Sequence, residues 1–370
     1  MHRRDFLGAT VAAGTLLTLG QPARADSAAG AAPGRAQIVA TLRQVNGYWM
    51  RTTPATSGDN DWDWATYHNG NMALFELLGE RKYYDYSLAW ARKQDWAIRQ
   101  SPSRPFFADY HIPGEVYLSL YKVDPQPERL TAITRELDAL IASDRTNLWT
   151  WVDALHMGMP VLQKFGQHLG KPGYLARMHE LYLFTKNRAA GSSGGFYNRS
   201  TGLWWRDKKY VGTTTYWSRG NGWALAALGK MLTGLPVTDP RRAGYAQVMC
   251  EMAAPLRRSQ RSDGLWPANL GAPEEYPAPE TSGTALFTYG IAAGVNAGVL
   301  DAATYRPVAE RAWQGMVTHA VHPSGFLGYV QREGQKPSDH QPVTYRDTSM
   351  FGVGSFLLAG VEMARLATPS

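Results

Sequence analysis

Hydrophobic positions recur with helical spacing from residue 35 to 367, and two kinds of helical segment alternate along the chain. In the first kind the apolar residues form one stripe. Over 241–258 that stripe includes Tyr245, Val248 and Met252, whereas Arg241 and Glu251 lie outside it. The second kind, such as "TALFTYGIAAG" and "MFGVGSFLLAG", is apolar or small on nearly every side. A striped helix covers a core, and a helix that is hydrophobic all round is buried all round.

This pattern predicts twelve helices and little strand. Their expected ranges are 35–50, 65–79, 82–99, 113–123, 127–142, 151–169, 173–189, 220–233, 241–258, 281–297, 302–319 and 347–367. Six amphipathic helices alternating with six buried ones describe an inner ring inside an outer ring, which is an all-α (α/α)6 barrel of six helical hairpins. A superhelical repeat array is the competing all-α fold, but it would show a fixed period, and the chain shows none.

The segments that precede the buried helices differ from the others in composition. They include "WATYHNGN" (64–71), "FADYHIPGE" (107–115), "LWTWVDALH" (148–156) and "YWSRGNGW" (216–223), all rich in aromatic, polar or glycine residues. Segments that precede the amphipathic helices are ordinary capping sequences. All inner helices of a double ring point the same way, so these segments meet at one end of the barrel. We expect the functional site at that end.

Candidate acids occur in the same segments. They are Asp109, Glu115, Asp153, Glu280 and Asp347. Asp153 is flanked by tryptophans, and apolar neighbours raise the pKa of a carboxyl group, so that it can donate a proton at neutral pH. The structural alternatives are a first-turn Asp153 that complements the helix dipole and an Asp109 that caps the helix from 113. Two such carboxylates at one end of a barrel favour an acid/base pair.

Other chemistries fit the sequence less well. No histidine stands at metal-ligand spacing with a carboxylate, no serine lies in a nucleophile elbow, and "RGNGW" lacks the dinucleotide fingerprint. We therefore expect neither a metal nor an organic cofactor. Trp217, Arg219 and Trp223 instead suggest a ring-shaped ligand held by aromatic faces and one charge.

The amino-acid composition adds little to these predictions of the fold and the site. The 370 residues include 13 Trp and 19 Tyr, which suit sugar stacking or a large helical core. The net charge of +7 favours polyanionic partners. The lack of Lys/Arg runs argues against nucleic acid, which leaves an acidic oligosaccharide as the expected partner.

The N-terminal residues have the sequence pattern of a targeting segment. Arg3 and Arg4 precede an apolar stretch and then "ARA" (23–25), which predicts a twin-arginine signal peptide over 1–25, cleaved near Ala25. Residues 26–34 would be a linker and 35–370 the catalytic domain. The mature protein would be periplasmic or secreted, without a membrane segment. The single cysteine, Cys250, excludes an internal disulfide, and we expect it to be buried.

Three segments resemble a known family. "LWTWVDALHMGMP" (148–160), "YWSRGNGWALAALGKML" (216–232) and "YPAPETSGTALFTYGIAAGVNAG" (276–298) are similar to the unsaturated rhamnogalacturonyl hydrolases of glycoside hydrolase family 105. The unsaturated glucuronyl hydrolases of family 88 are more distant relatives. The resemblance covers most of residues 40–367, and members of the family are (α/α)6 barrels.

The resemblance also implies a reaction and its residues. An aspartate protonates C4 of a Δ4,5-unsaturated uronic acid at the non-reducing end, water adds at C5, and the hemiketal opens with loss of the glycosidic bond. Asp153 would be the general acid/base and Asp109 the second acid. The residues implied to bind the sugar are Tyr67, Asn69, His111, Trp149, Arg206, Trp217, Arg219, Asn221 and Trp223.

Two positions depart from the family pattern. Arg206 and Asp207 stand where some relatives carry a histidine, and Tyr110 follows Asp109 where a second aspartate is usual. A barrel-type polysaccharide lyase, a sugar epimerase and a non-catalytic glycan-binding protein are the alternative functions. The galacturonyl or glucuronyl preference, the linkage and the aglycone sugar, the oligomeric state and the cleavage of the signal peptide are left open.

Overall fold

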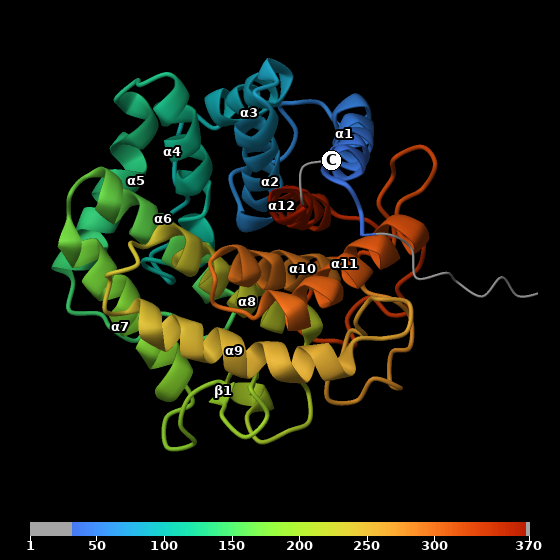
Figure 1. Cartoon of the computed structure of the whole chain (residues 1–370). Helices are drawn as coiled ribbons and strands as arrows, with labels where there is room; N and C mark the ends of the chain where they lie inside the picture. Colours follow the sequence, from blue (N-terminus) through green and yellow to red (C-terminus); the bar gives the residue numbers. More distant parts are fainter. Residues whose placement is uncertain (1–31, 368–370) are drawn as a thin grey trace, which may run out of the picture. The chain divides into compact units, whose positions relative to one another are not determined.

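The computed structural model describes residues 32–367, and its helical unit begins at Pro33 (Figure 1). Its helices are α1 (Arg35–Thr52), α2 (Trp62–Leu78), α3 (Arg81–Lys93), α4 (Pro113–Val123), α5 (Glu128–Ala142), α6 (Ala154–His168), α7 (Pro172–Asn187), α8 (Ser218–Gly234), α9 (Arg242–Ser259), α10 (Thr281–Asn296), α11 (Ala302–His319) and α12 (Met350–Leu366). These correspond one to one with the predicted helices. The predicted signal peptide and residues 26–31 of the linker lie outside the described residues.

The even-numbered helices form a closed inner ring. Contacts run from α2 to α4, α6, α8, α10 and α12 in turn, and α12 contacts α2 again. The odd-numbered helices pack outside this ring, as α9 does on α8 (Figure 1). The predicted (α/α)6 barrel is therefore confirmed.

Burial follows the two kinds of helix seen in the sequence. Every residue of α8 from Ser218 to Leu232 is buried, and so is every residue of α10 from Thr281 to Gly294. The outer helix α9 buries mainly the stripe predicted for it, including Tyr245, Val248 and Met252. Helices that are apolar on all sides thus occupy the ring that is covered on all sides.

Small residues allow the inner helices to pack closely. A Cβ atom added to Gly70 of α2 would lie 2.3 Å from the carbonyl oxygen of Gly354 on α12, so any larger residue would separate the two backbones. At the beginnings of the same helices, the rings of Trp62 and Phe351 have their centroids 5.0 Å apart. The close packing therefore extends to the end of the barrel where α2 and α12 begin.

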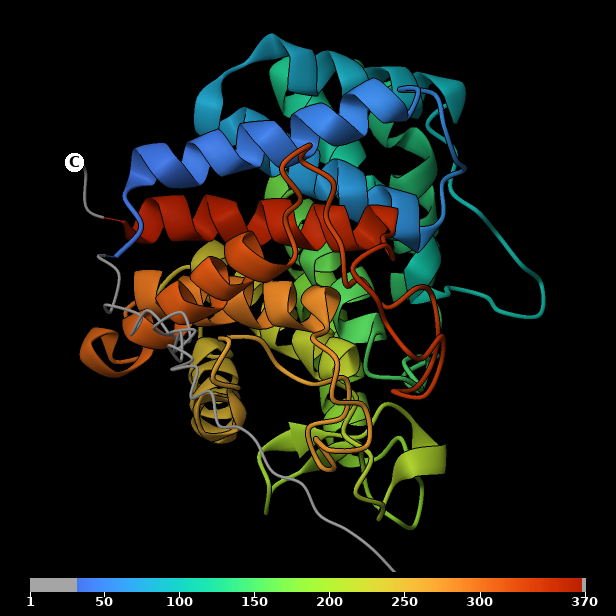
Figure 2. The same ribbon diagram turned by 90° about the vertical axis from the view of Figure 1, so that its right-hand side faces the viewer.

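The connections at the two ends of the barrel differ in length. Those that precede inner helices are long, and the longest are 188–217, 260–280 and 320–349; those at the other end are short, such as 79–80 and 169–171. The first long one contains a hairpin of β1 (Tyr197–Asn198) and β2 (Leu203–Trp204). Figure 2 shows the long loops at the right and the C-terminal end of α12 at the left.

Cys250 corrects one prediction. It lies on α9 and is exposed, because α9 belongs to the outer ring and Cys250 is outside the buried stripe of that helix. Among residues 32–367, no helix combines the length and the apolar character that crossing a membrane requires.

Candidate active site

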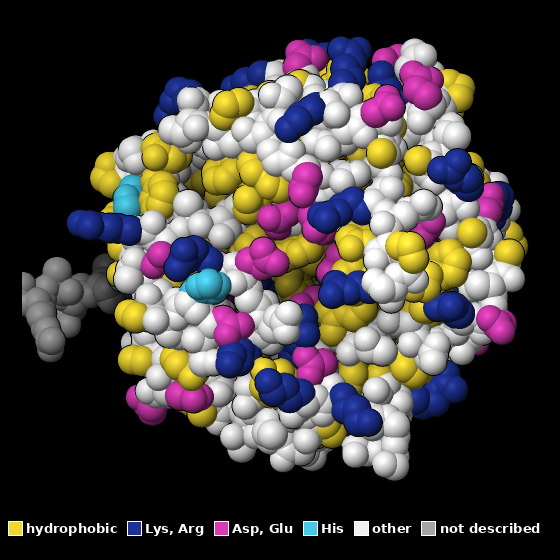
Figure 3. Space-filling model, turned by 180° about the vertical axis from the view of Figure 1, so that it is seen from behind, with side chains coloured by type: hydrophobic (Ala, Val, Ile, Leu, Met, Phe, Trp, Pro, Cys, Tyr) yellow, Lys and Arg dark blue, Asp and Glu magenta, His cyan; other side chains and the backbone are white. Residues whose placement is uncertain are grey.

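A cavity of about 430 Å³ opens at the end of the barrel where the inner helices begin. Its lining residues are Asp61, Trp62, Arg104, Phe107, Asp109, Tyr110, Thr150, Trp151, Asp153, Met157, Arg206, Asp207, Trp217, Arg219, Trp223, Glu333, Gly334 and Gln335. Figure 3 shows a hollow near the centre of the molecule seen from behind, with acidic, basic and hydrophobic side chains around it. Such a mixed aromatic and charged wall is suited to a sugar that carries a charge.

Asp153 is a buried acid with one unpaired carboxylate oxygen. It is the residue before α6, but its side chain makes no capping hydrogen bond, which removes capping as the reason for its position. Its Oδ1 has no hydrogen-bond partner within the described residues, and its Oδ2 lies 3.5 Å from Nε of Arg206. Burial raises the pKa of Asp153, while the charges of Arg206 and Arg219 oppose that rise.

Asp109 enters the same cavity from the segment between α3 and α4. It lies in a short 3-10 helix (Ala108–Tyr110), and it does not cap α4, whose preceding residue is Ile112. Its Oδ1 is buried and has no hydrogen-bond partner among residues 32–367. Burial raises the pKa of Asp109 well above its ordinary value, and the neighbouring charge of Asp153 raises it further.

The segment after β2 holds Arg206 beside Asp153. The Val152 amide donates a hydrogen bond of 2.7 Å to the carbonyl of Arg206, and Trp151 forms a β-bridge with Asp207. The guanidinium of Arg206 also contacts Asp207, with Nη1 2.8 Å from Oδ2. Arg206 is thus placed to stabilise Asp153 when that residue is ionised.

Arg219 and Trp217 organise another part of the wall. The Arg219 side chain is fully buried and donates hydrogen bonds to the carbonyls of Gln331 (2.6 Å) and Arg332 (3.0 Å). Its guanidinium carbon lies 4.4 Å from the Trp217 ring centroid, and Trp217 Nε1 donates to Gln331 Oε1 at 2.8 Å. Burial lowers the pKa of Arg219 to about 10. Arg219 therefore holds the segment that carries Glu333–Gln335, as well as lining the cavity.

The glycines of "RGNGW" allow close packing around them. The segment is the first part of α8, not a loop. A Cβ atom on Gly222 would lie 2.7 Å from Cβ of Leu286, so this glycine allows α8 to pack against α10. One on Gly220 would lie 3.3 Å from Val152 Cγ1 and 3.7 Å from Asp153 Oδ1. The glycines thus bring helices together beside Asp153.

The structure brings together six of the eleven predicted site residues. Asp109, Asp153, Arg206, Trp217, Arg219 and Trp223 line the cavity. Their catalytic and binding roles remain predictions.

The other five predicted site residues lie elsewhere. Tyr67 is fully buried and its hydroxyl donates to Asn46 Oδ1, and Asn69 lines a separate cavity described below. The His111 ring is buried, with Nε2 3.8 Å from Glu136 Oε1 on α5. Trp149 is buried against Gly158 of α6. These four residues do share the predicted segments, but none of them lines the active-site cavity.

Asn221 is a structural residue in this fold. Its side chain is fully buried, its Oδ1 accepts from the Trp204 amide at 2.8 Å, and its Nδ2 donates to the carbonyls of Trp204 and Trp217 at 3.0 Å each. Asn221 therefore joins α8 to β2, and through β2 it supports Arg206.

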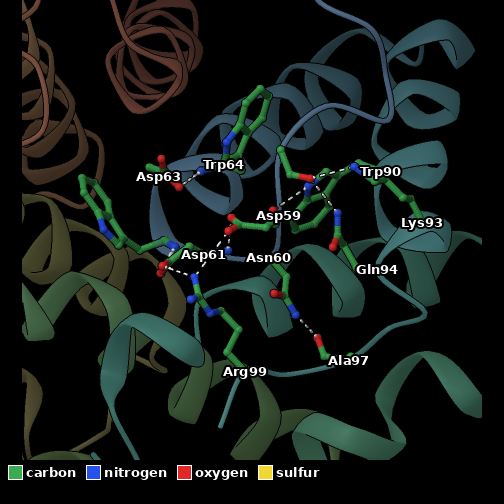
Figure 4. A network of polar contacts seen from close by, with 12 residues as sticks. Asp59, Asn60, Asp61, Asp63, Trp64, Trp90, Lys93, Gln94, Ala97 and Arg99 are labelled. Carbon is green, nitrogen blue, oxygen red and sulfur yellow. Dashed lines mark hydrogen bonds and ion pairs between the residues drawn. The ribbon is translucent and has the colours of Figure 1, made fainter. Parts of the chain in front are cut away.

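Part of the cavity wall was not predicted from the sequence. Asp61 and Trp62 lie just before the predicted start of their helix at 65, whereas α2 begins at Trp62 and Asp61 caps it. Figure 4 shows Arg99 contacting both Asp59 and Asp61, which fixes this corner to the segment after α3. Glu333 and Gln335 come from a long connection without any periodicity, so no sequence signal could place them.

The described part of the chain, residues 32–367, contains no group of three or more His, Cys, Asp or Glu side chains arranged to hold a metal ion. The chemistry that the cavity supports directly is proton transfer by two carboxyl groups.

Comparison with known proteins identifies the family of the chain. Residues 41–367 match the family model described as Glycosyl Hydrolase Family 88. A protein of Formosa agariphila named unsaturated 3S-rhamnoglycuronyl hydrolase is 35% identical over 346 residues, 86% of this chain and 88% of that protein. A solved structure of a family 88 glycosyl hydrolase from Bacteroides vulgatus has 33% identity and a TM-score of 0.83, covering 90% of this chain and 99% of that one. Another, named polysaccharide lyase, has 36% identity and a TM-score of 0.83, covering 90% and 97%.

The chain belongs to glycosyl hydrolase family 88, and the protein is a glycoside hydrolase. The sequence motifs suggested family 105 first and family 88 as a relative; the family model that matches is that of family 88.

Proposed function

We propose that the protein hydrolyses oligosaccharides that end in a Δ4,5-unsaturated uronic acid. The observation that carries this proposal is the pair Asp109 and Asp153, which face one aromatic-lined cavity with raised pKa values and unpartnered oxygens. A protonated carboxyl group is what the first step requires, because C4 of an enol ether must receive a proton before water can add.

The reaction proceeds by hydration. Asp153 gives its proton to C4, the electron pair of the C4=C5 bond forms the new C–H bond, and positive charge develops at C5 and the ring oxygen. Water attacks C5 and returns a proton to the Asp153 carboxylate, which Arg206 stabilises in the meantime. The hemiketal then opens, and the sugar that was attached at C1 leaves as an alcohol. One water is consumed, and Asp153 ends protonated as it began.

The aromatic wall of the active-site cavity is suited to binding a sugar ring next to Asp109 and Asp153. Trp151 stacks on Phe107 with ring centroids 4.6 Å apart, and Trp223 packs edge-on against Trp62 at 6.1 Å. Aromatic faces held in this way suit the C–H-rich faces of a sugar. The name of the Formosa agariphila relative supports a substrate in which the uronyl residue is attached to rhamnose.

The test is the ultraviolet absorbance of the conjugated enol-ether acid during incubation with lyase-generated unsaturated oligosaccharides. The proposal predicts loss of absorbance. A rise with intact polymer would instead indicate a lyase, the function named for one structural relative. No change with any substrate would favour a glycan-binding protein.

We also propose that the protein is exported through the twin-arginine pathway, on the basis of Arg3, Arg4 and the cleavage motif that ends at Ala25. N-terminal sequencing of the mature protein from its native host is expected to begin at about Asp26. A mature protein that retains Arg3 and Arg4 would contradict this proposal.

A further inference from the structure

A second cavity, of about 270 Å³, opens at the other end of the barrel. Its lining includes Lys164 of α6, Lys230 of α8 and Arg365 of α12, each in the C-terminal half of its inner helix. Asp153 and Lys164 are eleven positions apart along α6, which corresponds to ~16 Å along the helix axis. This second cavity is therefore distinct from the candidate active site.

Its floor carries an unusual cluster of buried charge. The Glu115 carboxylate receives hydrogen bonds from Lys164 Nζ (2.6 Å) and from Lys230 Nζ (2.8 and 3.0 Å). Glu115 and Lys230 are more than nine-tenths buried. Burial would raise the pKa of Glu115, but the two ammonium groups outweigh it and hold the pKa below its ordinary value. One carboxylate thus serves two ammonium groups, and one positive charge is left over.

Two further donors in this cavity lack a partner. Asn69 is more than nine-tenths buried and lines the cavity, and its Nδ2 makes no hydrogen bond within the described residues. Tyr289 is 5% exposed and lines the same cavity, and no hydrogen bond among residues 32–367 involves its hydroxyl. Buried polar groups in proteins are normally paired, so an unpaired buried amide in a cavity wall points to a ligand.

The rim of the second cavity adds both hydrogen-bond donors and hydrogen-bond acceptors. Lys122 and Arg365 are exposed cations, Glu76 is an exposed acid, Glu362 is a buried acid that pairs with Arg365, and Gln167 is an exposed amide. A volume of about 270 Å³ corresponds to roughly nine water molecules at ~30 Å³ each. This space exceeds that of one inorganic anion and suits a single sugar.

We propose that this cavity binds a hydroxylated carboxylic acid of the size of one uronic acid. The surplus positive charge on Lys164 and Lys230 would meet its carboxylate, and the donors and acceptors of the wall would meet its hydroxyls. The choice of a uronate rests on the proposed function, which releases an acid of this class. The presence of an anion site at this end of the barrel does not depend on that function.

The test is isothermal titration of the full chain with glucuronate, which has no double bond and cannot undergo the proposed reaction. Two conservative variants, Asn69→Leu and Tyr289→Phe, each remove one unpartnered donor without leaving a buried charge. Each is expected to weaken glucuronate binding about fivefold, the effect of one hydrogen bond. Tyr174→Phe is the matched control, because the Tyr174 hydroxyl contacts Asp138 on the outer ring, and it should bind as the parent does.

Three outcomes would overturn the proposal. An unchanged affinity for glucuronate in both variants would show that glucuronate does not bind in the second cavity, because any binding in the first cavity is independent of Asn69 and Tyr289. If glucose bound as tightly as glucuronate, the cavity would not recognise the carboxylate of its ligand. Inorganic sulfate binding in preference to glucuronate would make the cavity a site for a simple anion. None of these results depends on loss of absorbance by unsaturated substrates, so the proposed function stands or fails separately.

Discussion

Substitution of Glu115 by Gln tests how much the buried charge cluster contributes to the barrel. The change keeps the shape of the side chain but removes the charge that Lys164 and Lys230 share through three hydrogen bonds of 2.6 to 3.0 Å. Loss of one partner from a buried ion pair costs about 3–5 kcal/mol. The Lys164 side chain is 35% exposed and can turn toward water, so we expect the lower value, about 3 kcal/mol.

Urea denaturation of the parent and of Glu115→Gln measures this difference in the free energy of unfolding. Asp138→Asn is the matched control, because Asp138 also contacts a lysine and a hydroxyl, Lys171 and Tyr174, but its side chain is 47% exposed. A surface pair contributes about 1 kcal/mol or less. Equal losses in the two variants would refute the argument that burial makes the Glu115 cluster important.

The contribution of the Glu115 cluster to the stability of the protein should depend on pH. The pKa of Glu115 is lower in the folded protein than its ordinary value of 4.5, so its contribution is fully present above pH 4.5 and is lost as the pH falls below that value. The stability difference between the parent and Glu115→Gln should therefore shrink as the pH falls below 4.5. A difference that is constant or grows on acidification would contradict the assigned direction.

Two further predictions concern the candidate active site. Arg206→Met removes a charge that lowers the pKa of Asp153, so the alkaline limb of the pH profile of kcat/KM should move to higher pH. We also expect kcat to fall about 10- to 100-fold, because the Asp153 carboxylate formed during the reaction loses its partner. An alkaline limb that moves to lower pH would contradict the role of Arg206. Asn221→Ala breaks three hydrogen bonds to the backbone of Trp204 and Trp217, and urea denaturation should show a loss of about 2–3 kcal/mol; a loss below about 0.5 kcal/mol would contradict its structural role.

The fold could be predicted because burial leaves a direct signal in the sequence. Helices of the inner ring are covered on every side, so "MFGVGSFLLAG" has no polar face, whereas α9 shows one apolar stripe and charges elsewhere. Helix ends were less accurate. The sequence predicted a start at 65 for α2, but Asp61 caps the helix and Trp62 and Trp64 already belong to it.

The site was predictable at the level of segments and less so at the level of side chains. The segments that precede inner helices do meet, which brought Asp109 and Asp153 into one cavity. A residue on a helix can face either the cavity or a neighbouring helix, however, and composition does not distinguish the two. Tyr67 and His111 therefore turned out to face α1 and α5. Glu333 was missed because it depends on Arg219 holding a distant connection in place.

The central claim is that Asp153 donates the proton that starts hydration of the double bond. The most direct test compares the parent and Asp153→Asn on the same unsaturated oligosaccharide, following ultraviolet absorbance for turnover and calorimetry for binding. We expect the parent to bleach the absorbance and the variant to bind the substrate while its turnover falls by at least about 100-fold, the usual contribution of a general acid. Turnover by Asp153→Asn at the rate of the parent would contradict the mechanism.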